Sequence, residues 1–433
     1  MVHINLIPRH LRIKVIIFSF GCHLSMMIAG IAMNWPSPLT AWYSSKDSEV
    51  PMTEHEVSWM VAIPAIGAGV VAIPSGMLAD MFGRKTVLLG LGISSALSSV
   101  LIMMTRSKWA LYVAQVLGGI VLGGVPCVAP IYTAEISPPN IRGAIVGQLN
   151  TMFFVGQLLV YLIGPQLSYT NYTRFCCSIP ILFFVFFGFA PESPYYLMSK
   201  GRDEEAKDCM TKLRGKDSIA ELEESMKESQ EKESKDKPSI WAVLKTNNYL
   251  KYMICLQMLS CASTLNGASS MSVYAVEFLG GQWVAVQMGL IFTVTSFFAA
   301  FVADPVGRRP LLMGSLIGAA VFTSILAAYF ICHEKILLYV GLFGFCTVCS
   351  LGINPCMMTL PSELFPTSLR AFANGLSQLS TNFFGFICIK IFVNINETLG
   401  IRYNFFLYTI ISLLGAVAGY FLPETAKSVI SAS

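Results

Sequence analysis

Charged residues are scarce in this sequence. Only 12% of its 433 residues are Asp, Glu, Lys or Arg, whereas about a quarter is usual in a soluble domain. Apolar residues make up 54% and the mean hydropathy is +0.62. This composition argues against a soluble enzyme and indicates that lipid is the solvent of most of the chain. The net charge of +4 forms no basic stripe, which excludes nucleic acid as a partner.

Catalytic and metal-binding patterns are also lacking. The sequence has no Ser/His/Asp arrangement and no phosphate-binding loop. Its 12 cysteines lie mostly inside apolar runs, where they act as small apolar side chains. Cys346 and Cys349 have the spacing of a metal-binding pair, but neither a histidine nor a second pair accompanies them. We therefore expect no enzyme activity, no metal and no cofactor.

A cleavable signal peptide is not indicated either. The basic residues Arg9, Arg12 and Lys14 precede an apolar run, as they would in a signal peptide. The run continues to Trp35 and Pro36 without a small-residue cleavage site. These residues predict a first transmembrane helix that stays in the protein.

Long apolar runs dominate the rest of the chain. Runs of roughly 18 to 24 residues, bounded by charges, proline or turn residues, match the length of a helix that crosses a bilayer. They predict an all-α membrane protein with twelve transmembrane helices, near residues 14–34, 57–79, 86–105, 109–133, 144–165, 175–190, 251–279, 283–303, 311–331, 336–360, 371–393 and 404–422.

One long polar stretch, roughly residues 191–250, interrupts the apolar runs. Residues 200–251 hold 12 Lys or Arg and 12 Asp or Glu. Such a mixture of opposite charges is typical of solvated helices. We interpret this stretch as a cytosolic helical linker without a catalytic role.

The distribution of positive charge predicts the orientation. With both termini in the cytosol, 22 Lys or Arg lie inside and 6 outside. Without the linker the ratio is still 10 to 6. Two glycosylation sequons, at Asn171 and Asn396, fall in loops that this orientation places outside. The two independent signals agree on one topology.

The chain contains an internal repeat of three charged motifs. The motifs are Asp80-Met-Phe-Gly83-Arg84-Lys85 with Asp304-Pro-Val-Gly307-Arg308-Arg309, Glu135 and Arg142 with Glu363 and Arg370, and Pro191-Glu192-Ser193 with Pro423-Glu424-Thr425. Their offsets, 224, 228 and 232 residues, are nearly equal. The repeat predicts two six-helix bundles in parallel orientation, at residues 1–190 and 251–433, joined by the linker at 191–250.

All three motifs fall at the predicted cytosolic ends of helices, where water and headgroups solvate charges. We predict that they form a cytosolic gate, whose ion pairs close the inner mouth and open when the bundles rock. The alternative is that the positive charges only fix the orientation. The predicted gate residues are Asp80, Gly83, Arg84, Glu135, Arg142, Glu192, Asp304, Gly307, Arg308, Arg309, Glu363, Arg370 and Glu424.

These motifs resemble those of the sugar porters of the major facilitator superfamily, most of all the facilitated trehalose and glucose transporters. The similarity covers nearly the whole chain. It includes the segments Asn34-Trp-Pro-Ser-Pro38, Tyr132-Thr-Ala-Glu-Ile-Ser-Pro-Pro-Asn-Ile-Arg-Gly143, Pro191-Glu-Ser-Pro-Tyr-Tyr-Leu197 and Pro361-Ser-Glu-Leu-Phe-Pro-Thr-Ser-Leu-Arg370. The resemblance implies the major facilitator fold and facilitative transport of a hexose or a trehalose-like disaccharide across the plasma membrane by alternating access.

The sequence departs from the family at several positions. Where the family has an arginine near the start of the fourth span, this chain has Gln115, which predicts a weaker inner gate in the first half. Where the family has paired amides in the seventh span, this chain has the segment 263–269. Where the family has an aromatic residue in the tenth span, this chain has Met358. Proton-coupled members of the family carry an aspartate in the first span, whereas this span has no carboxylate, so the resemblance implies downhill transport. A facilitator of another small polar solute and a non-transporting sugar sensor remain open alternatives, and the oligomeric state is not predicted.

A sugar requires amides and hydroxyls that converge near the middle of the bilayer, because each dehydrated hydroxyl costs free energy unless it is paired. For each such side chain, the alternative is a hydrogen bond between helices. The predicted substrate-binding residues are His23, Gln148, Asn150, Gln157, Asn266, Ser269, Asn354, Thr381 and Asn382.

Overall fold

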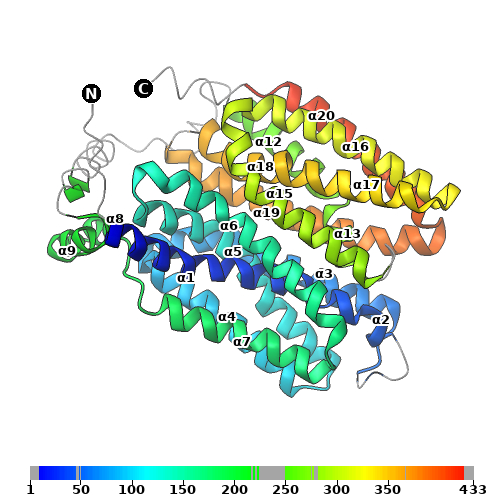
Figure 1. Ribbon diagram of the computed structural model, residues 1–433, viewed down its shortest axis with the longest axis horizontal. Helices are drawn as coiled ribbons and strands as arrows, with labels where there is room; N and C mark the ends of the chain where they lie inside the picture. Colours follow the sequence, from blue (N-terminus) through cyan, green and yellow to red (C-terminus); the bar gives the residue numbers. More distant parts are fainter. Residues whose placement is uncertain are drawn as a thin grey trace.

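The computed structural model describes residues 9–44, 50–215, 249–274, 281–365 and 367–423, together with residues 48, 218, 219, 222, 223 and 276. Every regular element in these ranges is a helix. The helices form two bundles that lie side by side, the N-terminal bundle in blue to green and the C-terminal bundle in green to red (Figure 1).

The N-terminal bundle consists of six long helices, which correspond to the first six predicted spans. They are α1 (Arg9–Asn34), α3 (Glu54–Phe82), α4 (Arg84–Met104), α5 (Lys108–Ile136), α6 (Pro139–Ile163) and α7 (Tyr169–Phe187). The short elements η1 (Ser37–Leu39), α2 (Thr40–Tyr43) and η2 (Gly164–Gln166) connect them at one end. A capping box begins α3, since the Thr53 hydroxyl accepts from the Glu56 N–H and the Glu56 carboxylate accepts from the Thr53 N–H.

The C-terminal bundle repeats this arrangement. Its helices are α12 (Tyr249–Leu265), α13 (Ala268–Val273), α15 (Gln282–Val306), α16 (Arg308–Cys332), α17 (Lys335–Val348), the π-helix η4 (Cys349–Ile353), α18 (Asn354–Leu364), α19 (Thr367–Thr398) and α20 (Ile401–Tyr420). The turn at Gly307, with φ 94°, repeats the turn at Gly83, with φ 101°. Only glycine adopts this backbone conformation without strain, so the same residue separates two helices at the same place in each bundle.

The predicted span over 251–279 is not one continuous helix. Gly267 has φ 96°, in the left-handed region, and separates α12 from α13. Because of this break, α12 is 17 residues long, and the described part of the chain contains 11 helices with the length and apolarity of a membrane span. With α12 and α13 counted as one interrupted crossing, the described helices account for all twelve predicted spans.

The two bundles meet through two antiparallel helix pairs. In one pair, α3 lies against α19, and the Lys390 ammonium donates to the Ser58 hydroxyl at 3.1 Å. In the other pair, α6 lies against α15, and Phe154 stacks on Phe292 with ring centroids 4.8 Å apart. Each pair joins one helix of each bundle. The space between the two helix pairs is therefore the middle of the molecule.

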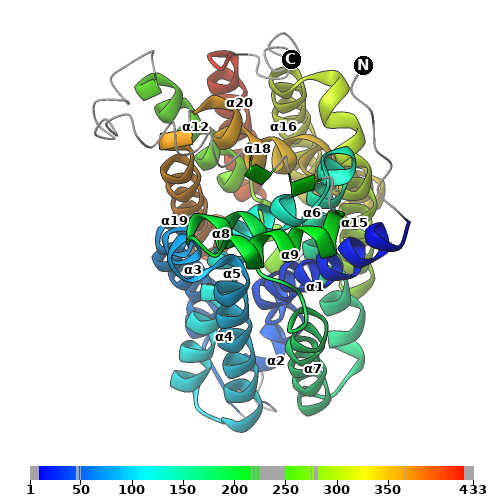
Figure 2. The ribbon, with the colours of Figure 1, turned by 90° about the vertical axis from the view of Figure 1, so that its left-hand side faces the viewer.

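The linker packs on one end of the N-terminal bundle, which we call the linker end. Its described helices, α8 (Pro194–Ser199) and α9 (Asp203–Arg214), lie across this end (Figure 2). Arg214 is 2% exposed and donates to the backbone oxygens of Glu135, at 2.7 Å, and Ile136, at 3.4 Å. These are the last carbonyls of α5, which have no partner within the helix. Arg214 therefore caps α5 and fixes the linker on the bundle.

Replacing Arg214 with methionine should lower the stability of the protein. The substitution keeps the apolar stem but removes charged hydrogen bonds at a buried site, each worth about 1.5–3 kcal/mol. The matched control is Lys212→Met, because Lys212 lies on the same helix and pairs with Asp208 at the surface, where their side chains are 71% and 63% exposed. We expect a lower thermal midpoint for the Arg214 variant alone. Equal midpoints for both variants would show that the cap does not stabilise the fold.

Candidate functional site

A cavity of about 240 Å³ lies between the two bundles. Helices α1, α3, α5 and α6 of the N-terminal bundle and α12, α13, α15, α18 and α19 of the C-terminal bundle supply its walls. Ligand pockets commonly occupy about 300–1,000 Å³. The cavity therefore suits a small solute and is placed where a relative movement of the bundles changes its access.

The polar side chains of the described cavity lining are neutral. Five amide side chains and six hydroxyl side chains reach it, and none of its described lining residues is charged. They are Asn150, Gln157, Asn354, Gln378 and Asn382, and Ser263, Thr264, Ser269, Ser272, Ser377 and Thr381. Amides and hydroxyls both donate and accept hydrogen bonds, as sugar hydroxyls do. The lining therefore matches a neutral solute with many hydroxyl groups.

Aromatic and thioether side chains form the apolar part of the cavity wall. The stacked rings of Phe154 and Phe292, with an interplanar angle of 6°, lie on either side of the contact between the bundles. Met358, which the sequence analysis places at the position of the tenth-span aromatic residue, and its neighbour Met357 also line the cavity. The aromatic surface that the sequence lacks in the tenth span is thus supplied by α6 and α15. These rings offer the apolar faces of a sugar ring a dry contact.

Six of the nine predicted substrate-binding residues line the cavity. They are Asn150, Gln157, Ser269, Asn354, Thr381 and Asn382. Sequence reasoning missed five polar lining residues, Ser263, Thr264, Ser272, Ser377 and Gln378, of which the last two precede Thr381 on α19 by four and three residues. This spacing places the three side chains on one face of a helix. With Thr381 as a predicted cavity residue, this spacing in the sequence was enough to predict Ser377 and Gln378 as well.

The other three predicted residues do not line the cavity. Asn266 is fully buried at the break between α12 and α13, where its side-chain oxygen accepts from the Ala268 N–H at 3.0 Å. His23 joins α1 to α6, because its ring nitrogens face the backbone oxygens of Ser19 and, at 2.9 Å, Ile145. Gln148 lies partly buried on α6.

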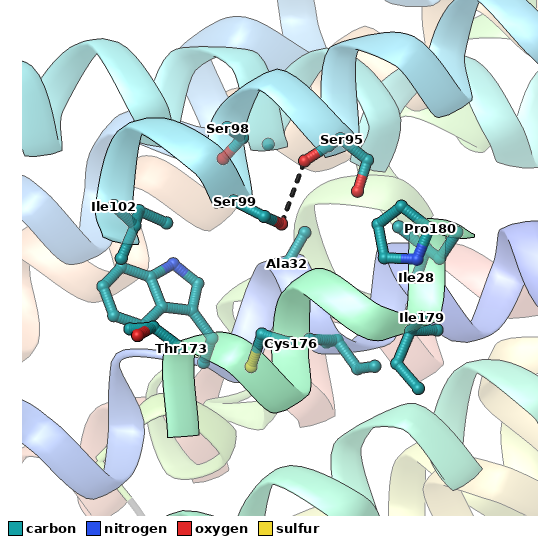
Figure 3. Close-up of a pocket in the computed structure, with 13 residues that line it drawn as sticks. Ile28, Ala32, Ser95, Ser98, Ser99, Ile102, Thr173, Cys176, Ile179 and Pro180 are labelled. Atoms are coloured by element: carbon teal, nitrogen blue, oxygen red, sulfur yellow. Dashed lines mark hydrogen bonds between the residues drawn. The ribbon is translucent and has the colours of Figure 1, made fainter. Parts of the chain in front are cut away.

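A second cavity lies inside the N-terminal bundle, among α1, α4, α5 and α7 (Figure 3). Ser95, Ser98 and Ser99 of α4 line it together with Thr173 and Cys176 of α7. The Ser99 hydroxyl donates to the Ser95 carbonyl at 3.0 Å, so part of this polar surface is already satisfied. The volume of about 30 Å³ has room for about two water molecules and not for a sugar.

Matching ion pairs lie at the linker end of each bundle. The Arg84 Nε is 3.2 Å from Glu135, and the side chains are 14% and 18% exposed. In the second bundle, the Arg308 Nε is 3.1 Å from Glu363, and the side chains are 13% and 19% exposed. Arg84 also contacts Asp80 at 3.0 Å. The repeated sequence motifs thus build the same ion pair twice.

The remaining predicted gate residues surround these pairs. The Glu192 carboxylate accepts from the Lys85 N–H at 3.0 Å and so holds the linker against the start of α4. Arg309 donates to the Tyr420 carbonyl at 2.7 Å, and Arg142 lies partly buried in α6. The side chains of Asp304 and Arg370, and the whole of Glu424, lie outside the described residues.

Each gate ion pair formed by described residues joins groups of one bundle. The described contacts therefore brace each bundle at its linker end, and the predicted gate between the bundles stays a prediction.

The Gln115 departure has its own structural role, away from the linker end. Gln115 is 1% exposed near the start of α5, accepts from the Trp35 indole at 2.7 Å and donates to the Met60 carbonyl at 3.0 Å. It thus ties α1, α3 and α5 together at the end opposite the linker. The Arg84–Glu135 pair of the same bundle forms without an arginine at this position.

The two sequons also lie at the end opposite the linker. Asn171 is exposed in the first turn of α7, and Asn396 is partly buried near the end of α19. Both lie within helix ends and not in loops, because the helices extend further than the apolar runs predict. The structure thus places both sequons at the end of the molecule that the charge distribution predicts to lie outside the cell.

Comparison with known proteins identifies the family. The family model described as "Sugar (and other) transporter" matches residues 25–431. The chain belongs to this family. Its curated relatives include the facilitated trehalose transporter Tret1 of Bombyx mori, 26% identical over 94% of this chain and 83% of the relative. Another is the human solute carrier family 2 facilitated glucose transporter member 6, 25% identical over 95% of this chain and 89% of the relative.

Solved structures share the fold. The partially occluded, inward-open structure of the xylose transporter XylE from E. coli superimposes with a TM-score of 0.80, at 19% identity, over 95% of this chain and 98% of that chain. XylE is a member of the major facilitator superfamily. The chain therefore has the major facilitator fold. As a member of a sugar-transporter family, it is a multi-pass membrane protein and not an enzyme.

Proposed function

We propose that this sugar-transporter family member carries a neutral sugar, a hexose or a trehalose-like disaccharide, by facilitated transport. The observation that carries the proposal is the cavity between the bundles, whose polar lining consists of amides and hydroxyls. The names of the trehalose and glucose transporters among its relatives support the same substrate class. The cavity volume of about 240 Å³ favours a hexose over a disaccharide in this conformation.

Facilitated transport is favoured by the chemistry of the lining. No Asp or Glu is among the described residues that line the cavity, so no carboxylate there takes up a proton with the solute. Transport then follows the concentration gradient of the solute. Alternating access requires that the bundles move relative to each other around this site.

The orientation follows from charge. The linker end carries the cytosolic excess of Lys and Arg, and the opposite end carries both sequons. We place the linker end and both termini in the cytosol, and the protein in the plasma membrane. Glycosidase treatment of the protein from intact cells should shift its electrophoretic mobility. Removal of both asparagines should abolish that shift.

Counterflow in proteoliposomes tests the proposed function. Vesicles that contain the purified protein and unlabelled sugar should accumulate labelled sugar transiently, with saturation and without dependence on a pH gradient. The panel should include glucose, other hexoses, trehalose and polyols. Accumulation that requires a pH gradient would contradict facilitated transport, and accumulation of none of these solutes would contradict the substrate class.

Gln157→Leu should weaken the transport of the accepted sugar. Gln157 lines the cavity, and its Nε2 donates to the Tyr161 hydroxyl at 2.8 Å; we expect its side-chain oxygen to accept from a solute hydroxyl, which the substitution leaves without a partner. One unpaired buried hydroxyl costs about 1–3 kcal/mol, which corresponds to a rise of about fivefold to 150-fold in the half-saturating concentration. Gln148→Leu is the matched control, because it makes the same change on α6 at a residue that does not line the cavity. Equal effects of both variants would contradict the assignment of the site.

A further inference from the structure

Lys390 joins the two bundles at the end opposite the linker. It belongs to α19, and its ammonium lies 3.1 Å from the Ser58 hydroxyl and 4.4 Å from the ring centroid of Trp59, both on α3. Trp59 also contacts Phe386 of α19, with ring centroids 5.8 Å apart. A cation over the face of a tryptophan is the most favourable cation–π arrangement. The charge of Lys390 is thus held across the boundary between the bundles.

This contact is adjacent to the candidate solute cavity. Ile389, the residue before Lys390, lines the cavity, and so does Val61, two residues after Trp59. A solute that leaves the cavity toward the end opposite the linker therefore meets the contact between α3 and α19.

Two carboxylates lie near this contact in the sequence, and neither forms a described ion pair with Lys390. Glu56, the carboxylate on α3 closest in sequence to Ser58, forms an ion pair with Lys108 of α5 at 2.5 Å. Glu397, seven residues beyond Lys390 on the same helix, acts on the ammonium electrostatically, but the described residues show no ion pair between the two. The ammonium is therefore held by an aromatic face and a hydroxyl of the opposite bundle, in contrast to the ion pairs of the linker end.

We propose that Lys390, Trp59 and Ser58 form an outer gate. The inference rests on the alternating-access mechanism of the proposed function. In this conformation the gate holds α3 against α19 and closes the cavity on the side opposite the linker. Opening to that side separates the two helices, so the ammonium leaves the indole face and becomes hydrated.

Lys390→Met tests the outer gate, because it keeps the length and the apolar contacts of the side chain and removes the charge. Amide hydrogen exchange in lipid nanodiscs reports the opening at both ends of the protein. The variant should exchange about twofold to thirtyfold faster than the wild type in residues 54–66 and 386–398, a range that matches the loss of a cation–π contact. Exchange near residues 136–145, at the linker end, should slow, because the same population shift closes that end.

Two variants serve as controls. Lys390→Arg keeps a cation over the indole and should behave like the wild type. Arg402→Met removes a similar contact, because Arg402 lies 5.0 Å from the ring centroid of Tyr403, but both residues belong to α20 and do not join the bundles. Arg402→Met should leave exchange at both ends unchanged.

The outcomes distinguish an outer gate from a contact that has no gating role. Wild-type exchange in Lys390→Met, or the same acceleration in Arg402→Met, would overturn the proposal. If Lys390→Met is poorly folded, Trp59→Leu tests the same contact from the other bundle, and wild-type exchange in that variant would also overturn it. Hydrogen exchange needs no solute. If hydrogen exchange shifts as expected but no sugar shows counterflow, the result supports the outer gate. It then contradicts only the proposed substrate class.

Discussion

Replacing Gly119 with alanine should destabilise the protein far more than the same change at Gly76. A methyl group at Gly119 of α5 would lie 2.2 Å from the Pro64 carbonyl oxygen of α3. One turn further along α5, a methyl group at Gly123 would lie equally close, 2.2 Å, to the Ala68 carbonyl oxygen, so the two helices touch backbone to backbone here. Because the neighbouring atoms are backbone, they cannot rotate away as a side chain can. Overpacking of this kind costs about 1–3 kcal/mol or more.

Gly76 is the matched control for this prediction. It lies on α3, one of the two helices in the contact, and a methyl group added there meets nothing within 4 Å. Alanine in a helix is otherwise favoured over glycine by about 0.5–1 kcal/mol, so Gly76→Ala should be neutral or slightly stabilising. Size-exclusion chromatography after heating measures the folded fraction of each variant. Equal thermal midpoints would mean that α3 and α5 are not packed backbone to backbone.

The sequence was sufficient to predict the helices and their repetition. Apolar runs identify the spans because every backbone polar group in lipid must be satisfied within a helix. The motifs around Gly83 and Gly307 mark equivalent turns in both bundles, and the structure confirms them. The break at Gly267 was not predicted. Hydropathy averages over a window and carries no information about the φ angle of one residue, and the apolar pattern continues across the break.

Cavity residues were harder to predict, because polarity alone does not define the face of a helix. On α6, Asn150 and Gln157 are seven residues apart, which is close to two full turns, so both face the cavity. Gln148 is nine residues before Gln157, or about two and a half turns, and therefore lies on the opposite face. The sequence supplies these spacings but not the face that the second bundle covers. The contact of α6 with Phe292 of α15 determines that face.

The second prediction with a large effect concerns the ion pairs at the linker end. Glu363→Gln should reduce transport without reducing the amount of folded protein. The side chains of Arg308 and Glu363 are 13% and 19% exposed. Their ion pair therefore contributes more free energy than an exposed ion pair, which contributes about 0–1 kcal/mol. It is worth less than a fully buried pair, whose disruption costs about 3–5 kcal/mol. Because the pair braces α16 against α18 at the proposed cytosolic gate, its loss changes the population of the open state more than the fold.

We expect Glu363→Gln to reduce counterflow by about tenfold at an unchanged amount of folded protein, since a bias of about 1.4 kcal/mol changes a two-state population by that factor. Glu135→Gln should act in the same direction through Arg84, because the two pairs have nearly equal distances and exposure. Glu334→Gln, an exposed change at the end opposite the linker, is the matched control.

A double-mutant cycle with Arg308→Gln separates the ion pair from the effect of each charge alone. If the pair acts as a unit, the double variant should transport no worse than either single variant, since it leaves no charge without its partner. Wild-type counterflow in both Glu363→Gln and Glu135→Gln would contradict the gate. The repeated motifs would then serve only to orient the chain, which is the alternative that the charge distribution alone supports.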